Sequence, residues 1–275
     1  MKIHHWILVF LLISLTACTT SFHLARDFVQ QETDIHVLIL PPPDLIKSFS
    51  PVHPDSIETD DLRQLDHESI RFANMVDDSL FVHRFIQSLE YHLDMLYVTV
   101  YGPDEIDDFF NLDKPAYIFA VGQMELFEYI EKETLEGIYR GELHIETLEF
   151  TVLENNVWFE FARLHEPDKE AVVLFSSHVT SDMADPRFIG NRRTGNVSFE
   201  SGFYKLTTQD LYDLAYFSGR QNAYNIFDHL MNLYVANEMG RDPGFIFHYD
   251  MQNHAIREVG APGFIPITPP AINEN

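Results

Sequence analysis

Basic residues are scarce in this 275-residue sequence, which has 18 lysines and arginines against 43 aspartates and glutamates. The formal net charge is therefore −25 at pH 7. A chain this acidic does not bind nucleic acid by releasing counterions, and anionic lipid headgroups repel it. The composition excludes a nucleic-acid partner. We interpret the charge as a solvated surface that keeps the protein soluble, with attraction to a basic partner or cation as the alternative.

Sequence signatures of catalysis are also missing. The chain has no HExxH zinc motif, no GxSxG nucleophile turn and no glycine-rich loop that would hold a phosphate. Ser176 and Ser177 stand beside His178, but no acid can be assigned to complete a triad. Ligand types also cluster at 66–68 and 248–250, without the spacing of a metal site. From sequence we therefore assign no catalytic residue, no metal ligand and no cofactor.

Cysteine occurs once, at Cys18, which excludes an internal disulfide. The longest N-terminal apolar run, Trp6–Leu15, has ten residues, too few for a membrane-spanning helix, which needs about 20. It follows the positive Lys2 and ends at small residues, which is the order of a cleavable export signal. We predict that residues 1–17 are a signal peptide. Its removal takes away only Lys2, so the formal charge changes from −25 to −26.

The residues Leu15, Thr16, Ala17 and Cys18 resemble the lipobox of bacterial lipoproteins. In that family the cysteine is acylated and becomes the first residue of the mature chain, so the resemblance implies that Cys18 anchors the protein to a lipid bilayer. An ordinary signal peptide that leaves an unpaired thiol is the alternative. Thr19 is not the aspartate that marks retention in the inner membrane in this family. We expect an outer-membrane lipoprotein facing the periplasm, with a Gram-positive surface lipoprotein as the second option.

Apolar residues are plentiful elsewhere, with 45% hydrophobic and 13% aromatic residues. This is too much apolar surface for a disordered chain, so we predict a packed globule. We expect a lipidated N-terminus and tether at 18–34, which could instead be a short helix. A single domain follows at 35–239, and a proline-rich extended C-terminal arm at 240–275, either docked or disordered.

The periodicity of apolar residues in 35–239 predicts an α/β (α+β) fold with a mixed sheet. The first half reads as strand, helix, strand, helix, strand. The predicted strands are His36–Leu40, Leu96–Tyr101 and Ala116–Val121, the last ending before Gly122, and the first helix is capped by Asp77 or Asp78.

The second half predicts an antiparallel meander and a closing C-terminal helix. The β-rich runs are Tyr139–Val152, Val157–Leu164 and Ala171–Ser176, separated by turn-forming residues at 154–156 and 166–168. A polar loop from Ser177 to Lys205 is expected next. The helix is capped by Thr207 or Thr208, and Gly219 is expected to kink or divide it.

This order of elements is similar to that of the mixed α/β domain of envelope lipoproteins related to the curli secretion lipoprotein and to the penicillin-binding-protein activator lipoproteins. The resemblance concerns topology, covers roughly residues 35–239, and includes no diagnostic motif. It implies a non-catalytic adaptor or assembly factor that contacts an envelope protein or a cell-wall partner. A lipid-anchored envelope hydrolase, with a site assembled only in three dimensions, is the alternative.

One segment departs from the acidic background. Residues 185–202 contain three arginines and three glycines, a composition typical of a mobile loop that contacts an anion or a carboxylate. A solvated hairpin, whose arginines pair with acids such as Asp182 and Glu200, is the alternative. The predicted partner-binding residues are Arg187, Arg192 and Arg193.

Overall fold

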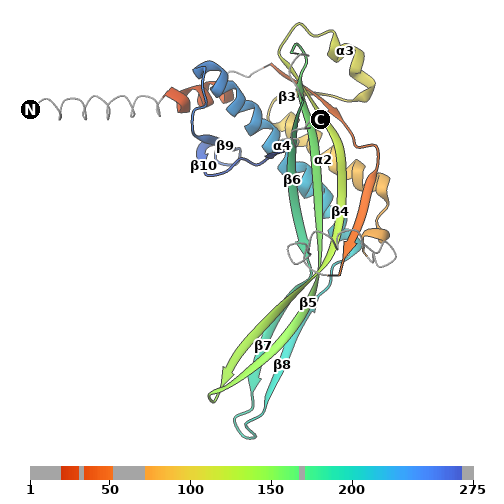
Figure 1. Ribbon diagram of the computed structural model, residues 1–275, viewed down its shortest axis with the longest axis vertical. Coiled ribbons are helices and arrows are strands. Elements are labelled where there is room, and N and C mark those ends of the chain that lie inside the picture. The colour runs from red at the N-terminus through yellow and green to blue at the C-terminus, as the bar shows by residue number, and fades with distance from the viewer. Residues whose placement is uncertain (1–19, 31–33, 52–71, 167–170, 268–275) are drawn as a thin grey trace, which may run out of the picture.

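The structure, a computed structural model, describes residues 20–30, 34–51, 72–166 and 171–267. Over these residues the predicted α/β (α+β) class is confirmed. A seven-stranded mixed sheet has the order β11-β6-β5-β4-β1-β3, and β2 also pairs with β4. Figure 1 shows this sheet and its helices as a body, from which a narrow pair of hairpins extends along the longest axis.

The strands and helices have the following bounds. The main sheet comprises β1 (Ile35–Leu40), β2 (Leu45–Ser50), β3 (Val98–Tyr101), β4 (Ala116–Tyr139), β5 (Glu142–Arg163), β6 (Val172–Ser181) and β11 (Ile265–Ile267). Two separate hairpins are formed by β7 (Met183–Gly190) with β8 (Val197–Tyr204), and by β9 (Ile246–Asp250) with β10 (Ala255–Val259). The helices are α2 (Asp78–Met95), α3 (Ile106–Phe110) and α4 (Thr208–Met239), with 3-10 turns at Ala73–Met75 and Pro103–Glu105. Residues 20–30 are also helical.

Strand β1 lies at the centre of the predicted strand–helix–strand–helix–strand unit. It pairs in parallel with both β3 and β4. Val37 and Ile39 belong to the large core that includes α2 and α4, whereas Leu38 packs with Phe109 of α3 in a smaller cluster. Because both faces of β1 are covered, its sequence is apolar apart from His36 and does not alternate.

Both long helices begin at the residues that the sequence indicates. The Asp77 side chain accepts a hydrogen bond from the backbone N–H of Leu80 at 2.8 Å. Thr207 forms a capping box with Asp210 at the start of α4. These side chains satisfy backbone donors that have no partner inside the helix.

Gly219 was expected to kink or divide α4, and the division is wrong. The helix is continuous through Gly219, and the glycine is fully packed against α2. A Cβ at this position would collide with the Phe85 carbonyl and would lie 2.9 Å from the Ser88 Cβ. The glycine therefore allows the backbones of α2 and α4 to approach each other closely.

Two predicted strand ends are also wrong. Strand β4 continues through Gly122, where the pairing register with β5 shifts. Strand β5 continues through residues 154–156, because β4 and β6 pair with it there on both sides. Asn155 is buried, and its amide donates to the Ser218 hydroxyl at 2.9 Å. Tertiary pairing thus overrides the local preference of asparagine for turns.

The prediction of a polar loop at 177–205 is also wrong. Strand β6 extends to Ser181, and most of the remaining segment is the β7–β8 hairpin. This hairpin lies along the distal half of the β4–β5 hairpin, as Figure 1 shows. We call residues 130–151 and 183–204 together the β arm.

The two hairpins of the β arm pack through their inner faces. Phe150 stacks on Phe203, with ring centroids 5.7 Å apart. Nearer the turns, Tyr139 fits over Gly190, where any Cβ would collide with its ring. The β arm therefore has a small apolar interior of its own.

The chain segments on either side of the domain are docked onto α4. In the predicted tether, residues 20–30 form a helix whose Phe28 is buried and contacts Phe227 and Tyr234. In the predicted C-terminal arm, β9 packs beside α4 and pairs with β10, and β11 extends the main sheet at β6. The predicted signal peptide and Cys18 lie outside the described residues.

Candidate functional site

The three arginines predicted to bind a partner lie on the β7–β8 hairpin. Arg187 is exposed on β7, opposite Glu200 on β8, while Arg192 and Arg193 are exposed in the turn between the strands. In the described part of the chain, no ion pair involves any of the three. Their charges are therefore available to a partner.

Asp182 does not pair with these arginines. It is buried at the root of the β7–β8 hairpin. Its carboxylate accepts the backbone N–H of Thr151 at 2.9 Å and that of Leu206 at 2.7 Å. Asp182 thus fixes the hairpin to the body rather than neutralising its arginines.

A fourth arginine, which sequence reasoning missed, joins the group at the end of the β arm. The Arg140 guanidinium donates to the Arg192 carbonyl at 2.8 Å and stands 5.6 Å from the Tyr139 ring centroid. The two turns, 139–142 and 191–196, together hold three arginines and one glutamate, which is a formal charge of +2. These two turns are thus basic on an acidic protein, whereas Glu136 and Glu146 lie next to Ile145 further along the hairpin.

Apolar side chains are exposed beside these turns. Ile138 is 79% exposed, Leu143 is 55% exposed and Ile145 is 54% exposed. Ile138 and Leu143 are direct partners across the hairpin. We call these three residues, with Arg140, Arg192 and Arg193, the arm tip. The apolar pair could not be recognised before the register of the long hairpin was known.

Neither Ser176 nor Ser177 is hydrogen-bonded to His178, and the Ser177 hydroxyl donates to the Glu154 carboxylate. The Ser176 hydroxyl donates to the Asn222 side chain at 2.7 Å. His178 is instead bonded to the Ser218 hydroxyl, at 3.1 Å. Ser218 is 0% exposed, so a substrate cannot reach it. Burial also lowers the pKa of His178 to about 4, so the ring is neutral.

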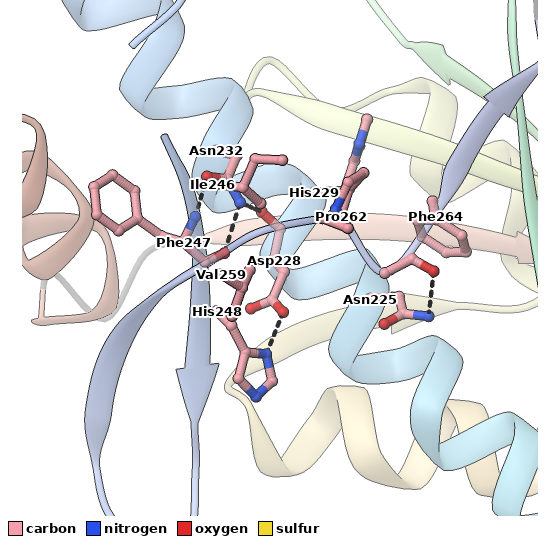
Figure 2. Close-up of a pocket in the computed structure, with 12 residues that line it drawn as sticks. Asn225, Asp228, His229, Asn232, Ile246, Phe247, His248, Val259, Pro262 and Phe264 are labelled. Carbon is pink, nitrogen blue, oxygen red and sulfur yellow. Dashed lines mark hydrogen bonds and ion pairs between the residues drawn. The ribbon is translucent and has the colours of Figure 1, made fainter. Parts of the chain in front are cut away.

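A cavity of about 270 Å³ lies between α4 and the C-terminal segment (Figure 2). Four polar residues of α4 line one side at positions i, i+3, i+4 and i+7, which share one helix face: Asn225, Asp228, His229 and Asn232. The other side is mainly apolar and consists of Ile246, Phe247, His248, Val259, Ala261, Pro262, Gly263 and Phe264.

Asp228 and His248 form a pair at the edge of this cavity, and Figure 2 shows them pointing toward each other. His248 Nδ1 donates to Asp228 Oδ2 at 2.6 Å, and the Tyr249 backbone N–H donates to Asp228 Oδ1 at 2.9 Å. Burial raises the pKa of Asp228, and the hydrogen bond to Asp228 raises the pKa of His248. The pair therefore holds its protons more tightly than separate side chains would.

The two asparagines hold the C-terminal segment over the cavity. Asn232 accepts the backbone N–H of Phe247 at 2.8 Å and donates to the Phe247 carbonyl at 2.8 Å. Asn225 donates to the Gly263 carbonyl at 3.2 Å, an approach that any side chain at Gly263 would block. These amides therefore have their partners within the protein.

His229 has no such partner. Its ring lies 4.7 Å from that of Phe161 and 6.4 Å from that of Phe264, measured between centroids. Its Nε2 is buried and makes no hydrogen bond with any described residue. Burial, with a smaller contribution from Arg163, lowers the pKa of His229 to about 4. The cavity wall thus contains a neutral imidazole with an unsatisfied nitrogen.

Two of the three residue types of a hydrolase catalytic triad, a carboxylate and an imidazole, lie at this cavity. A carboxylate that orients an imidazole is two thirds of a catalytic triad. The described lining contains no serine, threonine or cysteine to act as the nucleophile. Sequence reasoning missed the Asp228–His248 pair, although polar residues on the buried face of α4 were a signal that could have found it.

The ligand-type clusters noted in the sequence do not assemble a metal site in the described residues. His248 is bonded to Asp228, while the Asp250 side chain is bonded to Asn253. The cluster at 66–68 lies outside the described residues. Among those described, no group of three or more His, Cys, Asp or Glu side chains is placed to hold a metal ion.

Comparisons with known proteins give no family for this chain. No protein-family model matches it, and a search of curated proteins finds no match. In the part of the chain that the structure describes, no helix has the length and apolar character needed to span a membrane.

Proposed function

We propose that this protein is an outer-membrane lipoprotein facing the periplasm, anchored through acylated Cys18, and that it acts as a non-catalytic adaptor or assembly factor. It holds an envelope protein at the arm tip. The observation that carries the proposal is the β arm itself, a packed projection with exposed isoleucine, leucine and arginine side chains at its end.

The length of the β arm supports a role in which the arm tip contacts a partner that lies away from the body of the protein. Pairing between β2 and β4 ends at Tyr129, and β4 ends at Tyr139, which is ten residue steps further on. At about 3.3 Å per residue, the arm tip stands roughly 33 Å beyond the body. Figure 1 shows residues 20–30 on the body, far from this end of the molecule.

The chemistry of the arm tip indicates the partner. Ile138 and Leu143 form an exposed apolar pair, and such patches on soluble domains mark interaction sites. Three arginines lie in the two turns at this end of the β arm. The complementary surface is a protein with an apolar patch edged by carboxylates, since arginine binds carboxylates through paired hydrogen bonds.

The lipid-anchored hydrolase remains the second candidate, because the Asp228–His248 pair lies beside a cavity. The adaptor is favoured because that cavity has no nucleophile among its described lining residues, whereas the arm tip presents a surface that nothing in the described structure covers. The variant His248→Ala distinguishes the two functions. A hydrolase that acts through His248 would lose turnover in this variant, whereas an adaptor would still capture its partner.

Site-specific photo-crosslinking in the native envelope tests the adaptor proposal. A photoreactive phenylalanine derivative replaces Ile145 at the arm tip, and the matched control replaces Tyr91 on α2, because both residues are 54% exposed. We expect one discrete crosslinked protein from position 145 and none of it from position 91. Arg192→Glu with Arg193→Glu should reduce that product about tenfold, because it reverses the charge that attracts the partner.

The control for charge reversal is Arg84→Glu with Arg241→Glu, which changes the net charge equally but acts on exposed body residues. This control should leave the crosslinked product unchanged. Equal loss in both double variants, crosslinking only to lipid, or the same products from positions 91 and 145 would contradict the proposal.

A further inference from the structure

The outer edge of β6, close to the root of the β arm, is a surface separate from the arm tip. Strand β6 pairs with β5 along 172–181, whereas on its other side β11 covers only 173–175. Among the described strands, none pairs with 177–181 on that side. We propose that 177–181 and the neighbouring face of α4 bind an extended basic segment of a partner protein, which adds to the sheet as a strand. This site does not depend on the adaptor function of the arm tip.

The chain itself shows that this edge accepts a strand. Strand β11 adds there in the antiparallel direction, with Ile265 opposite Phe175 and Ile267 opposite Val173. The backbone N–H and C=O groups of an edge strand are a template for pairing with another segment. A partner segment alongside 177–181 extends the row of hydrogen bonds that β11 begins.

The segment 177–181 lacks the features that protect the other outer strands of the main sheet from pairing. Proteins block such edges with lysine, with proline or by making the strand very short. Strand β2 has Lys47, β11 has Pro266, and β3 has only four residues. The segment 177–181 has no proline and no lysine, and its His178 is neutral because burial lowers its pKa to about 4. This edge is therefore open to a partner strand.

A groove of about 290 Å³ lies beside this edge and can receive side chains of the partner segment. It is lined by Val179 and Thr180 of β6 and by Asp210, Asp213, Leu214 and Phe217 of α4. Because side chains alternate along a strand, every second residue of an added segment faces the groove. Leu214 and Phe217 form an apolar wall that suits a large apolar side chain.

The acids of the groove indicate the charge of the partner segment. Asp210 and Asp213 give its described lining a formal charge of −2, with no lysine or arginine. The hydrogen bond from the Thr207 hydroxyl lowers the pKa of Asp210, so this carboxylate is ionised at pH 7. Among the described residues, neither aspartate forms an ion pair. Lysine or arginine side chains in the partner segment are the complementary groups.

Three synthetic peptides test this proposal on the full-length protein. The probe Thr-Lys-Thr-Phe-Thr-Lys-Thr places its phenylalanine and both lysines on one face of a strand. Two further peptides keep these side chains but carry backbone N-methyl groups, on the even-numbered residues in one and on the odd-numbered residues in the other. Because successive N–H groups of a strand point to opposite edges, only one of the two keeps the donors that face β6.

We expect the probe to bind saturably, one methylated peptide to bind at least about tenfold more weakly, and the other to bind almost as well as the probe. Binding of the probe should slow amide hydrogen exchange within 177–181 by at least about fivefold. Exchange in β3, at the opposite edge of the sheet, should stay unchanged.

Two variants with matched controls locate the side-chain contacts. Phe217→Ala removes part of the apolar wall and should weaken the probe about tenfold. Its control, Tyr216→Ala, changes the neighbouring aromatic residue, which is 40% exposed against 37% for Phe217 and does not line the groove. Asp213→Lys should weaken the probe about fivefold, whereas Glu238→Lys makes the same charge change at the other end of α4 and should have little effect.

Four results would overturn the proposal. They are no saturable binding of the probe, equal affinity of the two methylated peptides, unchanged exchange at 177–181 when the probe is bound, and equal weakening by Phe217→Ala and Tyr216→Ala. The methylated peptides and the exchange measurement use the wild-type protein, so the proposal can fail even if a variant does not fold.

Discussion

His229 and His178 are kept neutral by the residues packed around them. Burial lowers the pKa of each to about 4, against about 6.5 in an unfolded chain. The folded state therefore excludes a proton that the unfolded state binds as the pH falls below 6.5. The stability that these two histidines confer is complete above pH 6.5 and is lost progressively as the pH falls toward 4.

The variant His229→Phe should make unfolding less sensitive to pH. Between pH 6.5 and 4 the wild type should lose up to about 3 kcal/mol through His229 alone, at roughly 1.4 kcal/mol per pH unit. Urea unfolding at several pH values measures this loss, and the phenylalanine variant should show a correspondingly flatter profile. His83→Phe is the control, and identical profiles for His229→Phe and wild type would show that folding does not lower the pKa of His229.

The effect of pH on the stability contributed by His248 has the opposite sign. Its hydrogen bond to Asp228 raises its pKa, so its stabilising charge is present below pH 6.5 and is lost as the pH rises through its folded value. The two histidines that line the same cavity thus respond to acid with opposite signs. Only variants at single positions can separate these contributions.

Among the elements, the predictions from sequence were correct where local chemistry determines the structure. The caps at Asp77 and Thr207 follow from side-chain hydrogen bonds over three residues, so the starts of α2 and α4 were predictable. The long strands were not, because pairing on both sides of β5 overrides the turn preference at 154–156.

For the candidate sites too, local features were predictable from the sequence and tertiary contacts were not. Arg192 and Arg193 stand out as a local cluster of charge, so sequence reasoning found them. The Asp228–His248 pair joins a helix to a hairpin that follows it, and the Ile138–Leu143 pair depends on the register of a 22-residue strand. Neither pair follows from local spacing, because both are made by tertiary contacts.

The contact between α2 and α4 depends on Gly219. Gly219→Ala should destabilise the protein by about 1–3 kcal/mol, although alanine favours helices by about 1 kcal/mol, because its Cβ would meet the Phe85 carbonyl and the Ser88 side chain. The midpoint of chemical denaturation measures this change. Gly102→Ala is the control, since nothing lies within 4 Å of a Cβ there. Equal midpoints for the two variants would mean that the helices are not in close contact.

At the scale of the whole molecule, the proposed anchor and the arm tip lie at different ends. Cys18 and residue 20 are two residues apart, so at most about 7 Å of chain separates Cys18 from the docked helix 20–30. A lipid on Cys18 therefore holds the body itself against the bilayer. Under the adaptor proposal the arm tip, roughly 33 Å beyond the body, is the part that contacts an envelope protein.

The two ends should be separable by mutation. Cys18→Ser removes the sulfur that we propose is acylated, so the protein should move from the membrane fraction to the soluble fraction. Arg192→Glu with Arg193→Glu should leave fractionation unchanged while it weakens crosslinking from position 145. Intact-mass measurement of the wild type should show the acyl chains directly. An unmodified sulfur, or a Cys18→Ser protein that still sediments with membranes, would contradict the lipid anchor. The proposed contact at the arm tip is tested separately, by crosslinking from position 145.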